Sequence, residues 1–180
     1  EKHHQHDVMA AADVVPSESV YQLEAELADQ HGTPVKFESL RGRPTLITMF
    51  YTSCQSVCPV LTVALQRIED ELTAEQRARL RVAMISLDAA RDTPEKLNQF
   101  SSSHKLDDRR WLLACASTDT VRDIAALLGI RYRQLPDGNF SHSAVITLLD
   151  ADGVIRARTE NLAQPDAAFV QSVRTYFAGP

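Results

Sequence analysis

The chain has 180 residues, of which 44% are hydrophobic, enough for one ordinary domain with a buried core. Its 19 Lys and Arg residues against 24 Asp and Glu residues leave a net charge of −5 with neutral His, so we expect neither nucleic acid nor an anionic membrane surface as a partner. No apolar run approaches the roughly 18 residues of a membrane-spanning helix. We therefore expect membrane association only through an anchor that is not part of this chain.

Residues 1–19 have no sustained periodicity and are predicted to form a flexible leader. This leader contains His3, His4 and His6, and a histidine-rich tract can bind metal, with a solvated tail as the alternative. If Glu1 is the mature terminus, its amine, two backbone amides and the His3 imidazole form a four-nitrogen site suited to Cu(II). We therefore hypothesise an auxiliary Cu(II) site at these three histidines.

Residues 20–180 are predicted to form a single domain in which strands and helices alternate. The expected elements are, in order, two strands around a turn at 29–32, a buried strand at 43–51, a helix from Pro59, a strand at 80–88, a helix at 91–100, a strand at 110–116, a helix at 117–129, a β-hairpin at 143–159 and a helix at 164–177. This alternation predicts an α/β protein with a central mixed sheet flanked by helices and an N-terminal β-hairpin extension.

Apolar spacing predicts which helix faces are buried. For the helix that begins at Pro59, a residue suited to a first helical position, the predicted buried residues are Val60, Val63, Ala64, Ile68 and Leu72. For the last helix they are Ala168, Val170, Val173, Tyr176 and Phe177.

Two of the three cysteines, Cys54 and Cys58, lie in "TMFYTSCQSVCPVL", where a predicted buried strand gives way to a helix. This placement is typical of a thioredoxin-like layout, in which functional groups gather at the carboxyl edge of the sheet. Residues four apart share one face of a helical turn. The helix start favours a thiolate at Cys58. The pair can form a disulfide, exchange one with a partner, or bind a soft metal such as Cu(I) or Zn(II).

A metal bound by two thiolates needs a further ligand, and a histidine distant in sequence is the candidate. His31 and His104 lie in polar segments and are predicted to be surface residues. His142 lies in a predicted loop just before a buried strand, although its position alone favours a structural or exposed residue. Cys115, in the apolar run "WLLACAS", is predicted to be a buried structural residue.

Asp88 follows a buried strand and is predicted to lie at the same edge of the sheet as the cysteines. It has two interpretations: a group that supports the metal ligands or contacts a partner, or a carboxylate that caps the turn before "RDTPE". Arg91 and Asp92 are predicted to hold that loop and the start of the next helix in place.

Three segments, "FYTSCQSVCPVL", "SLDAARDTPEKLNQF" and "FSHSAVITLLDADG", resemble in this order the Sco/SenC/PrrC family of copper-binding proteins. The resemblance covers about residues 20 to 178. It implies a thioredoxin-like fold and one copper ion, Cu(I) or Cu(II), bound by Cys54, Cys58 and His142. It also implies delivery of copper, or of reducing equivalents, to a respiratory copper enzyme such as cytochrome c oxidase.

The chain departs from the family pattern beside the cysteines. Family loops usually carry Pro and Asp after the first cysteine, where this chain has Gln55 and Ser56, and usually carry Pro where this chain has Ala89. The three implied ligands are unaffected. The missing carboxylate removes a negative charge near the metal, which can shift copper affinity and the choice of partner.

The leading hypothesis is a monomeric copper metallochaperone rather than an enzyme, in a bacterial periplasm or an equivalent outward-facing, membrane-anchored location. Its expected partners are a respiratory oxidase subunit, other copper carriers and thiol reductants. The alternative is a thiol–disulfide oxidoreductase that keeps a partner's copper-binding cysteines reduced, with Cys54 and Cys58 as its redox pair. A copper-responsive module that signals without transferring copper is a third possibility.

Overall fold

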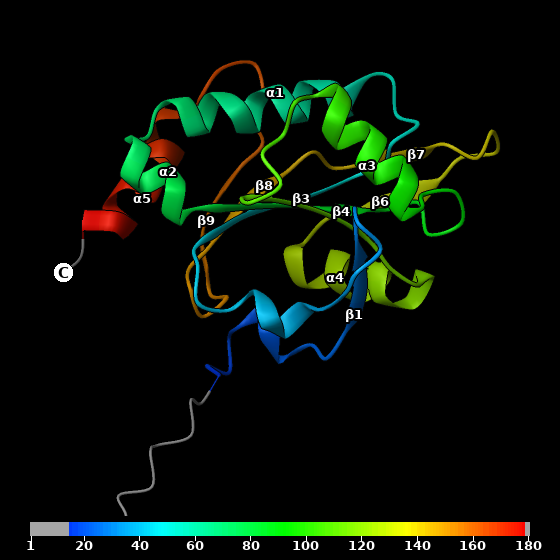
Figure 1. The fold of residues 1–180 in the computed structure, drawn as a ribbon, viewed down its shortest axis with the longest axis horizontal. Helices are drawn as coiled ribbons and strands as arrows, with labels where there is room; N and C mark the ends of the chain where they lie inside the picture. The colour runs from blue at the N-terminus through cyan, green and yellow to red at the C-terminus, as the bar shows by residue number, and fades with distance from the viewer. Residues whose placement is uncertain (1–14, 179–180) are drawn as a thin grey trace, which may run out of the picture.

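The structure is a computed structural model that describes residues 15–178. A seven-stranded mixed sheet forms its middle layer (Figure 1). Helices α1, α2, α3 and α5 lie on one face of this sheet, and α4 lies on the other face with the N-terminal segment (Figure 1). The predicted α/β class, with a central mixed sheet flanked by helices, is confirmed.

The described elements largely follow the predicted order. The strands are β1 Glu26–Asp29, β2 Pro34–Lys36, β3 Thr45–Phe50, β4 Arg81–Ser86, β5 Trp111–Cys115, β6 Tyr132–Gln134, β7 Phe140–His142, β8 Ile146–Leu149 and β9 Ile155–Thr159. The helices are α1 Val57–Asp70, α2 Ala74–Arg79, α3 Pro94–Ser103, α4 Thr118–Leu128 and α5 Ala167–Ala178, with short 3-10 segments at Val20–Gln22 and Phe37–Leu40.

The main sheet has the strand order β2-β1-β5-β4-β3-β8-β9. Its centre is parallel, because β3 pairs with β4 and β4 pairs with β5 in the same direction. Antiparallel strands flank this centre: β1 pairs with β5, and β8 pairs with β3. The predicted N-terminal hairpin is therefore confirmed, and it extends the sheet beyond β5.

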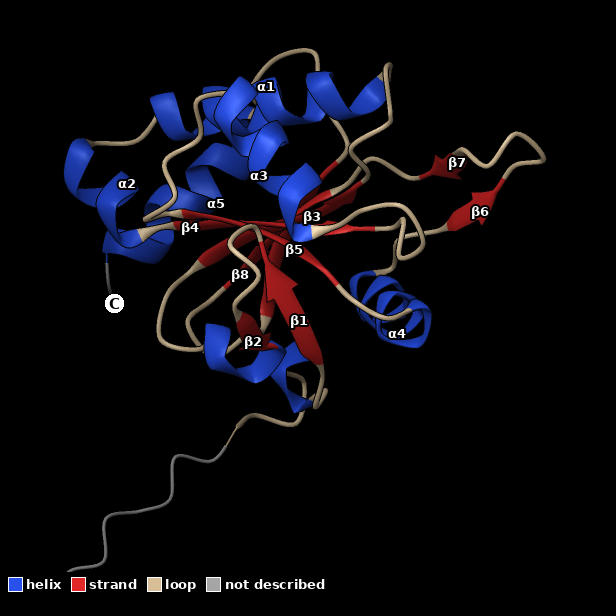
Figure 2. Ribbon diagram, turned by 45° about the vertical axis from the view of Figure 1, so that its right-hand side comes forward, coloured by secondary structure: helices blue, strands red, loops and turns tan. Residues whose placement is uncertain are grey.

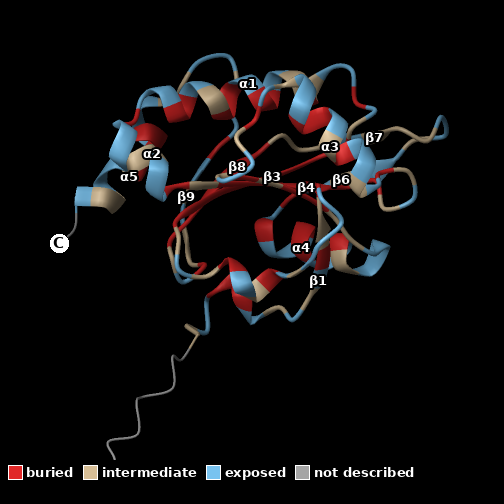
Figure 3. Cartoon of the chain, viewed as in Figure 1, coloured by how far each residue is buried: buried red, intermediate tan, exposed pale blue. Residues whose placement is uncertain are grey.

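Strand β3 is central because both of its faces are covered, as its apolar, β-branched sequence predicts. Leu46 and Phe50 pack with residues of α1, α3 and α5. Ile47 and Met49 point to the opposite face and pack with α4 and the 3-10 segments. Figure 3 shows the same division, with buried positions on the sides of the helices that face the sheet. The end of β3 is thus a rigid support for the segment that follows it.

Local capping signals explain the boundaries of two helices. Helix α3 begins with Pro94 after Thr93, whose side chain accepts a hydrogen bond from the Lys96 amide. Helix α4 begins after Ser117 and ends at Gly129, which adopts the left-handed conformation (φ 65°). Both helices agree with the prediction.

The predicted face of α1 is partly wrong. The helix begins at Val57, so Pro59 is its third residue instead of its first. Val60 and Val63 are 47% and 40% exposed, whereas Leu61 and Leu65 are fully buried. Ala64, Ile68 and Leu72 are buried as predicted, so the error is confined to the first two turns of the helix. A similar correction applies to α5, where the buried residues include Phe169, whereas the predicted Ala168 is exposed.

The sequence did not predict helix α2, the two 3-10 segments or the two-stranded hairpin of β6 and β7. Each strand of the hairpin is only three residues long, which is too short for a recognisable apolar alternation. No residue of either strand is fully buried. Figure 2 shows the hairpin projecting from the body of the protein, beyond the ends of the main strands.

Residues 1–14 lie outside the described residues, and with them His3, His4 and His6 of the predicted leader and its auxiliary Cu(II) site. Across residues 15–178, no helix is both long enough and apolar enough to span a bilayer.

The buried face of α1 can be tested with a pair of substitutions. Leu65→Ala should lower the free energy of unfolding by about 2–4 kcal/mol, because it leaves a cavity between α1 and the sheet. Val63→Ala, on the exposed face, should change it by less than about 0.5 kcal/mol. Urea unfolding followed by circular dichroism measures both. Equal losses for the two variants would contradict the assigned face.

Candidate functional site

Both cysteines of the pair lie at the carboxyl edge of the sheet, as predicted. Cys54 is in the loop after β3, and Cys58 is the second residue of α1. The two thiols are free, and the Cys58 backbone amide donates a hydrogen bond to the Cys54 sulfur over 3.4 Å. Ser56, at the usual capping position, makes no side-chain bond to the helix. The Cys54 sulfur therefore serves as the acceptor for an amide at the start of α1.

The two sulfurs differ in accessibility and acidity. Burial by itself raises the pKa of Cys54, but hydrogen bonds from Cys58 and from the Ser56 and Val57 amides outweigh it and lower the pKa from 9.0 to about 7. Burial raises the pKa of the Cys58 thiol well above 9.0, and its side-chain contact with Cys54 and the negative charges of Cys54 and Asp92 raise it further. The prediction that the helix start lowers the Cys58 pKa is therefore wrong. Cys54 receives that stabilisation instead.

Asp92 holds the cysteine loop in place through hydrogen bonds to Thr52. Its carboxylate accepts a hydrogen bond from the Thr52 amide at 3.0 Å and another from the Thr52 hydroxyl. It also accepts one from the Ser86 hydroxyl, at the end of β4, at 2.5 Å. Asp92 thus ties the loop after β3 to the end of β4, whereas the sequence predicted only that it holds its own loop and the start of the next helix.

His142 is the last residue of β7, and the predicted loop position is therefore wrong. Its Nδ1 lies 3.1 Å from the Ser143 carbonyl oxygen, so Nδ1 carries the proton. Its Nε2 is buried and has no hydrogen-bond partner among residues 15–178. Burial lowers the pKa of the imidazole, and the bond to Ser143 opposes this only in part. The ring therefore presents the lone pair of a neutral nitrogen to the interior.

Tyr51 joins the cysteine loop to the strand that carries His142. Its hydroxyl donates to the Phe140 carbonyl over 3.2 Å and accepts from the Phe140 amide over 3.3 Å. Its ring lies edge-on to the His142 ring, with centroids 6.0 Å apart. The Tyr51 carbonyl accepts the Cys54 amide over 3.2 Å. Burial raises the pKa of the Tyr51 phenol, and the nearby cysteine sulfurs raise it further.

The three predicted ligands are neighbours of Tyr51, but they do not form a closed metal site. In the part of the chain that the structure describes, no group of three or more His, Cys, Asp or Glu side chains is placed so that it could hold a metal ion. The two cysteines are in contact with each other. His142 would have to move toward them to complete a three-ligand site.

Asp88 is almost fully buried and contacts neither cysteine. Its carboxylate accepts the Arg91 backbone amide over 3.1 Å and forms an ion pair with the Arg91 side chain at 2.5 Å. These contacts are those of the turn-capping interpretation.

Of three other predicted surface or core residues, two differ in detail. Cys115 is only half-buried at the end of β5, and burial raises its pKa, with the negative charge of Asp92 contributing. His104 is half-buried and stacks on Phe100 with ring centroids 4.1 Å apart. His31 is half-exposed, in agreement with the prediction, and lies 3.1 Å from the Asp108 carboxylate.

A cavity of about 700 Å³ opens beside Cys54, between the cysteine loop and α3. Its lining residues are Thr52, Ser53, Cys54, Gln55, Pro59, Lys96, Gln99, Phe100, Ser103 and His104. Gln55, which departs from the family pattern, therefore faces the space through which a partner can reach Cys54. Cys54 is 8% exposed and lines this cavity, whereas Cys58 is fully buried, so Cys54 is the more accessible of the two.

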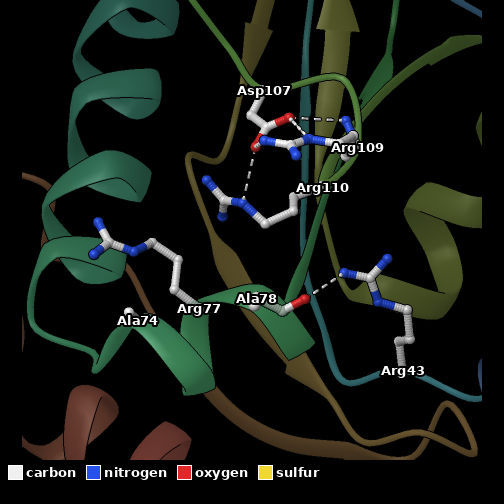
Figure 4. Close-up of a pocket in the computed structure, with 7 residues that line it drawn as sticks. All are labelled: Arg43, Ala74, Arg77, Ala78, Asp107, Arg109 and Arg110. Carbon is white, nitrogen blue, oxygen red and sulfur yellow. Dashed lines mark hydrogen bonds and ion pairs between the residues drawn. The ribbon is translucent and has the colours of Figure 1, made fainter.

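A second cavity, of about 420 Å³, is lined by four arginines and is shown in Figure 4. It lies at the opposite edge of the sheet, next to α2 and the segment before β5. Asp107 bonds to Arg109 and Arg110, and Arg43 donates to the Ala78 carbonyl (Figure 4). Because these guanidinium groups already have internal partners, this cavity is a weaker candidate for a functional site than the cysteine loop.

A mixed sheet covered by helices on both faces, with a dithiol where β3 runs into α1, defines a thioredoxin-like α/β protein. The chain belongs to the SCO1/SenC family, whose model matches residues 17–178.

Relatives and solved structures support this membership. A curated relative from Stutzerimonas stutzeri is 28% identical over 135 residues, which cover 73% of this chain and 65% of the relative, so the match spans slightly less than two thirds of that protein. The copper-bound structure of Bradyrhizobium japonicum ScoI is 26% identical, with a TM-score of 0.72 over 85% of this chain and 97% of that chain. A SCO1/SenC family lipoprotein from Bacillus anthracis has a TM-score of 0.77 at 19% identity, over 86% and 94% of the two chains, and shows the shared fold.

The difference between the two thiols can be tested by alkylation of the reduced, metal-free protein. Cys54 should react with iodoacetamide at a rate that falls as the pH drops through about 7, because only the thiolate is nucleophilic. Cys58 should remain unlabelled until the protein unfolds, because it is buried and protonated. Peptide mapping by mass spectrometry measures each site. Faster labelling of Cys58 than of Cys54 would contradict the assignment.

The role of Asp92 can be tested by substitution. Asp92→Ala should lower the free energy of unfolding by roughly 2–4 kcal/mol, because it leaves buried donors on Thr52 and Ser86 without an acceptor. As a control, Asp70→Ala removes a carboxylate that is 74% exposed, and should change the stability by less than about 0.5 kcal/mol. Urea unfolding measures both. A loss for Asp92→Ala no larger than for the control would show that this carboxylate does not hold the loop.

Proposed function

We propose that this protein is a copper metallochaperone that carries one copper ion, as its cargo, on Cys54, Cys58 and His142. The observation that carries the proposal is the buried Nε2 of His142, which has no hydrogen-bond partner beside a loop with two thiols. An unpartnered buried polar atom is unfavourable, so its retention calls for a ligand. Copper binding would supply one.

The chemistry of these groups suits Cu(I). Thiolates and a neutral imidazole are soft and borderline ligands of the kind that Cu(I) prefers. Metal-binding histidines commonly donate their other ring N–H to a carbonyl, as His142 does to Ser143. Cys54 is partly ionised near neutral pH, whereas Cys58 would lose its proton when the metal binds. Copper uptake should therefore release protons.

Completion of the site requires the β6–β7 hairpin to bring His142 toward the cysteines. This hairpin forms a separate two-stranded sheet and is not hydrogen-bonded into the main sheet. An isolated two-stranded ribbon is marginally stable and adjusts its position readily. We propose an open arrangement without copper and a closed one with copper.

The similarity to Bradyrhizobium japonicum ScoI, solved with copper bound, supports copper as the cargo. On the same basis we propose delivery to a respiratory copper enzyme such as cytochrome c oxidase. We also propose an outward-facing, membrane-anchored location, in line with the Bacillus anthracis neighbour, which is a lipoprotein. His3, His4 and His6 remain a proposed auxiliary Cu(II) site. We also propose that Asp88 supports the metal ligands and that the protein is a monomer.

Thiol–disulfide exchange is the alternative function, and the difference between the two sulfurs favours it specifically. The accessible Cys54 thiolate would attack a partner disulfide and form a mixed disulfide. Cys58 would then attack the Cys54 sulfur, which releases the partner as a dithiol and leaves a Cys54–Cys58 disulfide. Two electrons pass to the partner in this cycle, and His142 takes no part.

Substitution of His142 separates the two functions. His142→Ala should lower Cu(I) affinity at least tenfold, because it removes one of three ligands, and should shift the dithiol potential by less than about 30 mV. His31→Ala, which removes a half-exposed histidine, is the control and should change neither quantity. Competition with a Cu(I) chelator and redox titration measure them.

X-ray absorption of the copper-loaded protein should show two sulfur ligands and at least one nitrogen ligand, with one nitrogen lost in His142→Ala. Unchanged Cu(I) affinity in His142→Ala would contradict the three-ligand site and favour the exchange function.

A further inference from the structure

The hairpin that carries His142 is held to the rest of the protein at two points. At the start of β7, next to the turn, the Tyr51 hydroxyl bonds to both the amide and the carbonyl of Phe140. At its tip, Arg91 Nη2 donates to the Gly138 carbonyl over 2.6 Å. The hairpin strands pair only with each other within the described chain, and Tyr132 and Phe140 pack against the core. The position of the hairpin therefore depends on this packing together with the two side-chain contacts.

Arg91 is itself fixed at its base. Its Nε lies 2.5 Å from an oxygen of Asp88, a residue only 1% exposed, and its backbone amide donates to the other oxygen. The Asp88 amide donates to the Ser86 hydroxyl, which donates to Asp92, the carboxylate that holds the cysteine loop. An unbroken series of hydrogen bonds therefore runs from the cysteine loop to the tip of the hairpin.

The hairpin tip is shaped to receive this arginine. Gly138 adopts a positive φ of 85°, and a Cβ atom there would lie 3.4 Å from Arg91 Nη1. Glycine thus permits both the turn and the close approach of the guanidinium group. A side chain at 138 would be disfavoured chiefly by the positive φ of this turn.

We propose that Arg91 is a positioning residue that latches the β6–β7 hairpin to the loop before α3 and thereby sets the approach of His142 to the cysteines. The proposal rests on His142 being a copper ligand, as proposed above. A guanidinium group can bond to Asp88 through Nε and to Gly138 through Nη2 at once, whereas a lysine ammonium has one nitrogen. Asp88 neutralises the charge of Arg91, so Arg91 influences copper binding through the position of His142 and not through its own charge.

The latch can be tested without copper. In the reduced, metal-free protein, Arg91→Lys keeps the positive charge but cannot bond to Asp88 and Gly138 at the same time. The rate of amide hydrogen exchange at residues 132–142 should therefore rise roughly tenfold, as expected for the loss of a charge-assisted hydrogen bond. Arg133→Lys, on the exposed side of β6, is the matched control and should leave exchange unchanged. Unchanged exchange in Arg91→Lys would overturn the latch.

A second variant acts on the other partner of the ion pair. Asp88→Asn keeps the shape of the side chain but removes the charge that orients Arg91, and it should also speed exchange in the hairpin. Denaturant unfolding of both variants shows whether the domain stays folded, and exchange in β3 and β4 should remain slow. Fast exchange throughout the domain, with no excess in the hairpin, would count against a local latch.

A copper measurement then tests the positioning role. Arg91→Lys should lower Cu(I) affinity roughly tenfold, within the range for residues that orient metal ligands, while the nitrogen ligand persists and the dithiol potential is unchanged. Faster hairpin exchange with unchanged Cu(I) affinity would overturn the positioning role. The outcome is separable from failure of the proposed function, which would appear as normal copper binding in His142→Ala and would leave the metal-free exchange result intact.

Discussion

The buried carboxylate of Asp92 is the interaction on which the cysteine loop depends. It accepts hydrogen bonds from the backbone and side chain of Thr52 and from Ser86, and so holds the loop after β3 against the end of β4. A buried carboxylate is tolerated only when several donors satisfy it. Here those donors come from two neighbouring strand ends, and the same contacts place the loop that carries Cys54 over the start of α1.

This arrangement makes the two thiols unequal. Cys54 faces a cavity and receives hydrogen bonds from the amides at the start of α1, which stabilise its thiolate. Cys58 is fully buried, and the negative charges of Cys54 and Asp92 oppose its ionisation. Desolvation outweighs the helix dipole at Cys58, because burial acts on the whole charge whereas the dipole contributes only about 0.3–2 kcal/mol. The Cys54 sulfur is therefore partly ionised near neutral pH, whereas the Cys58 sulfur stays protonated.

The hairpin of β6 and β7 adds the third group of the site. His142 has a fixed tautomer through Ser143 and a free nitrogen in the interior. Its strand contacts the cysteine loop through Tyr51, and its tip contacts the Asp88–Arg91 pair. The site is therefore assembled from a rigid part, built on the central strands, and a separate ribbon whose position depends on a few side chains. Such a division suits the proposed role of a copper carrier, which must both bind and release its cargo.

Much of the fold could be predicted from the sequence, because its signals are local. Strand β3 is a continuous apolar, β-branched run, and the start of α3 is marked by Thr93 and Pro94. The sequence predicts the later part of the α1 face correctly, but it predicts burial of Val60 and Val63, which are exposed. The start of α1 at Val57 carries no local signal. The hairpin was missed because its strands are short and polar. It is held by Tyr51 and Arg91, residues far from it in the sequence.

The sequence by itself determined the class of fold and the place of the cysteine pair at a strand–helix junction. The set of candidate ligands came from the resemblance of three segments to the Sco/SenC/PrrC family. Only the tertiary structure decided which sulfur is the more acidic, which carboxylate holds the loop and where His142 stands. The pKa of a thiol depends on its burial and on charges brought near it by folding, and the position of a ribbon depends on contacts across the fold. Neither quantity is encoded in the spacing of residues along the chain.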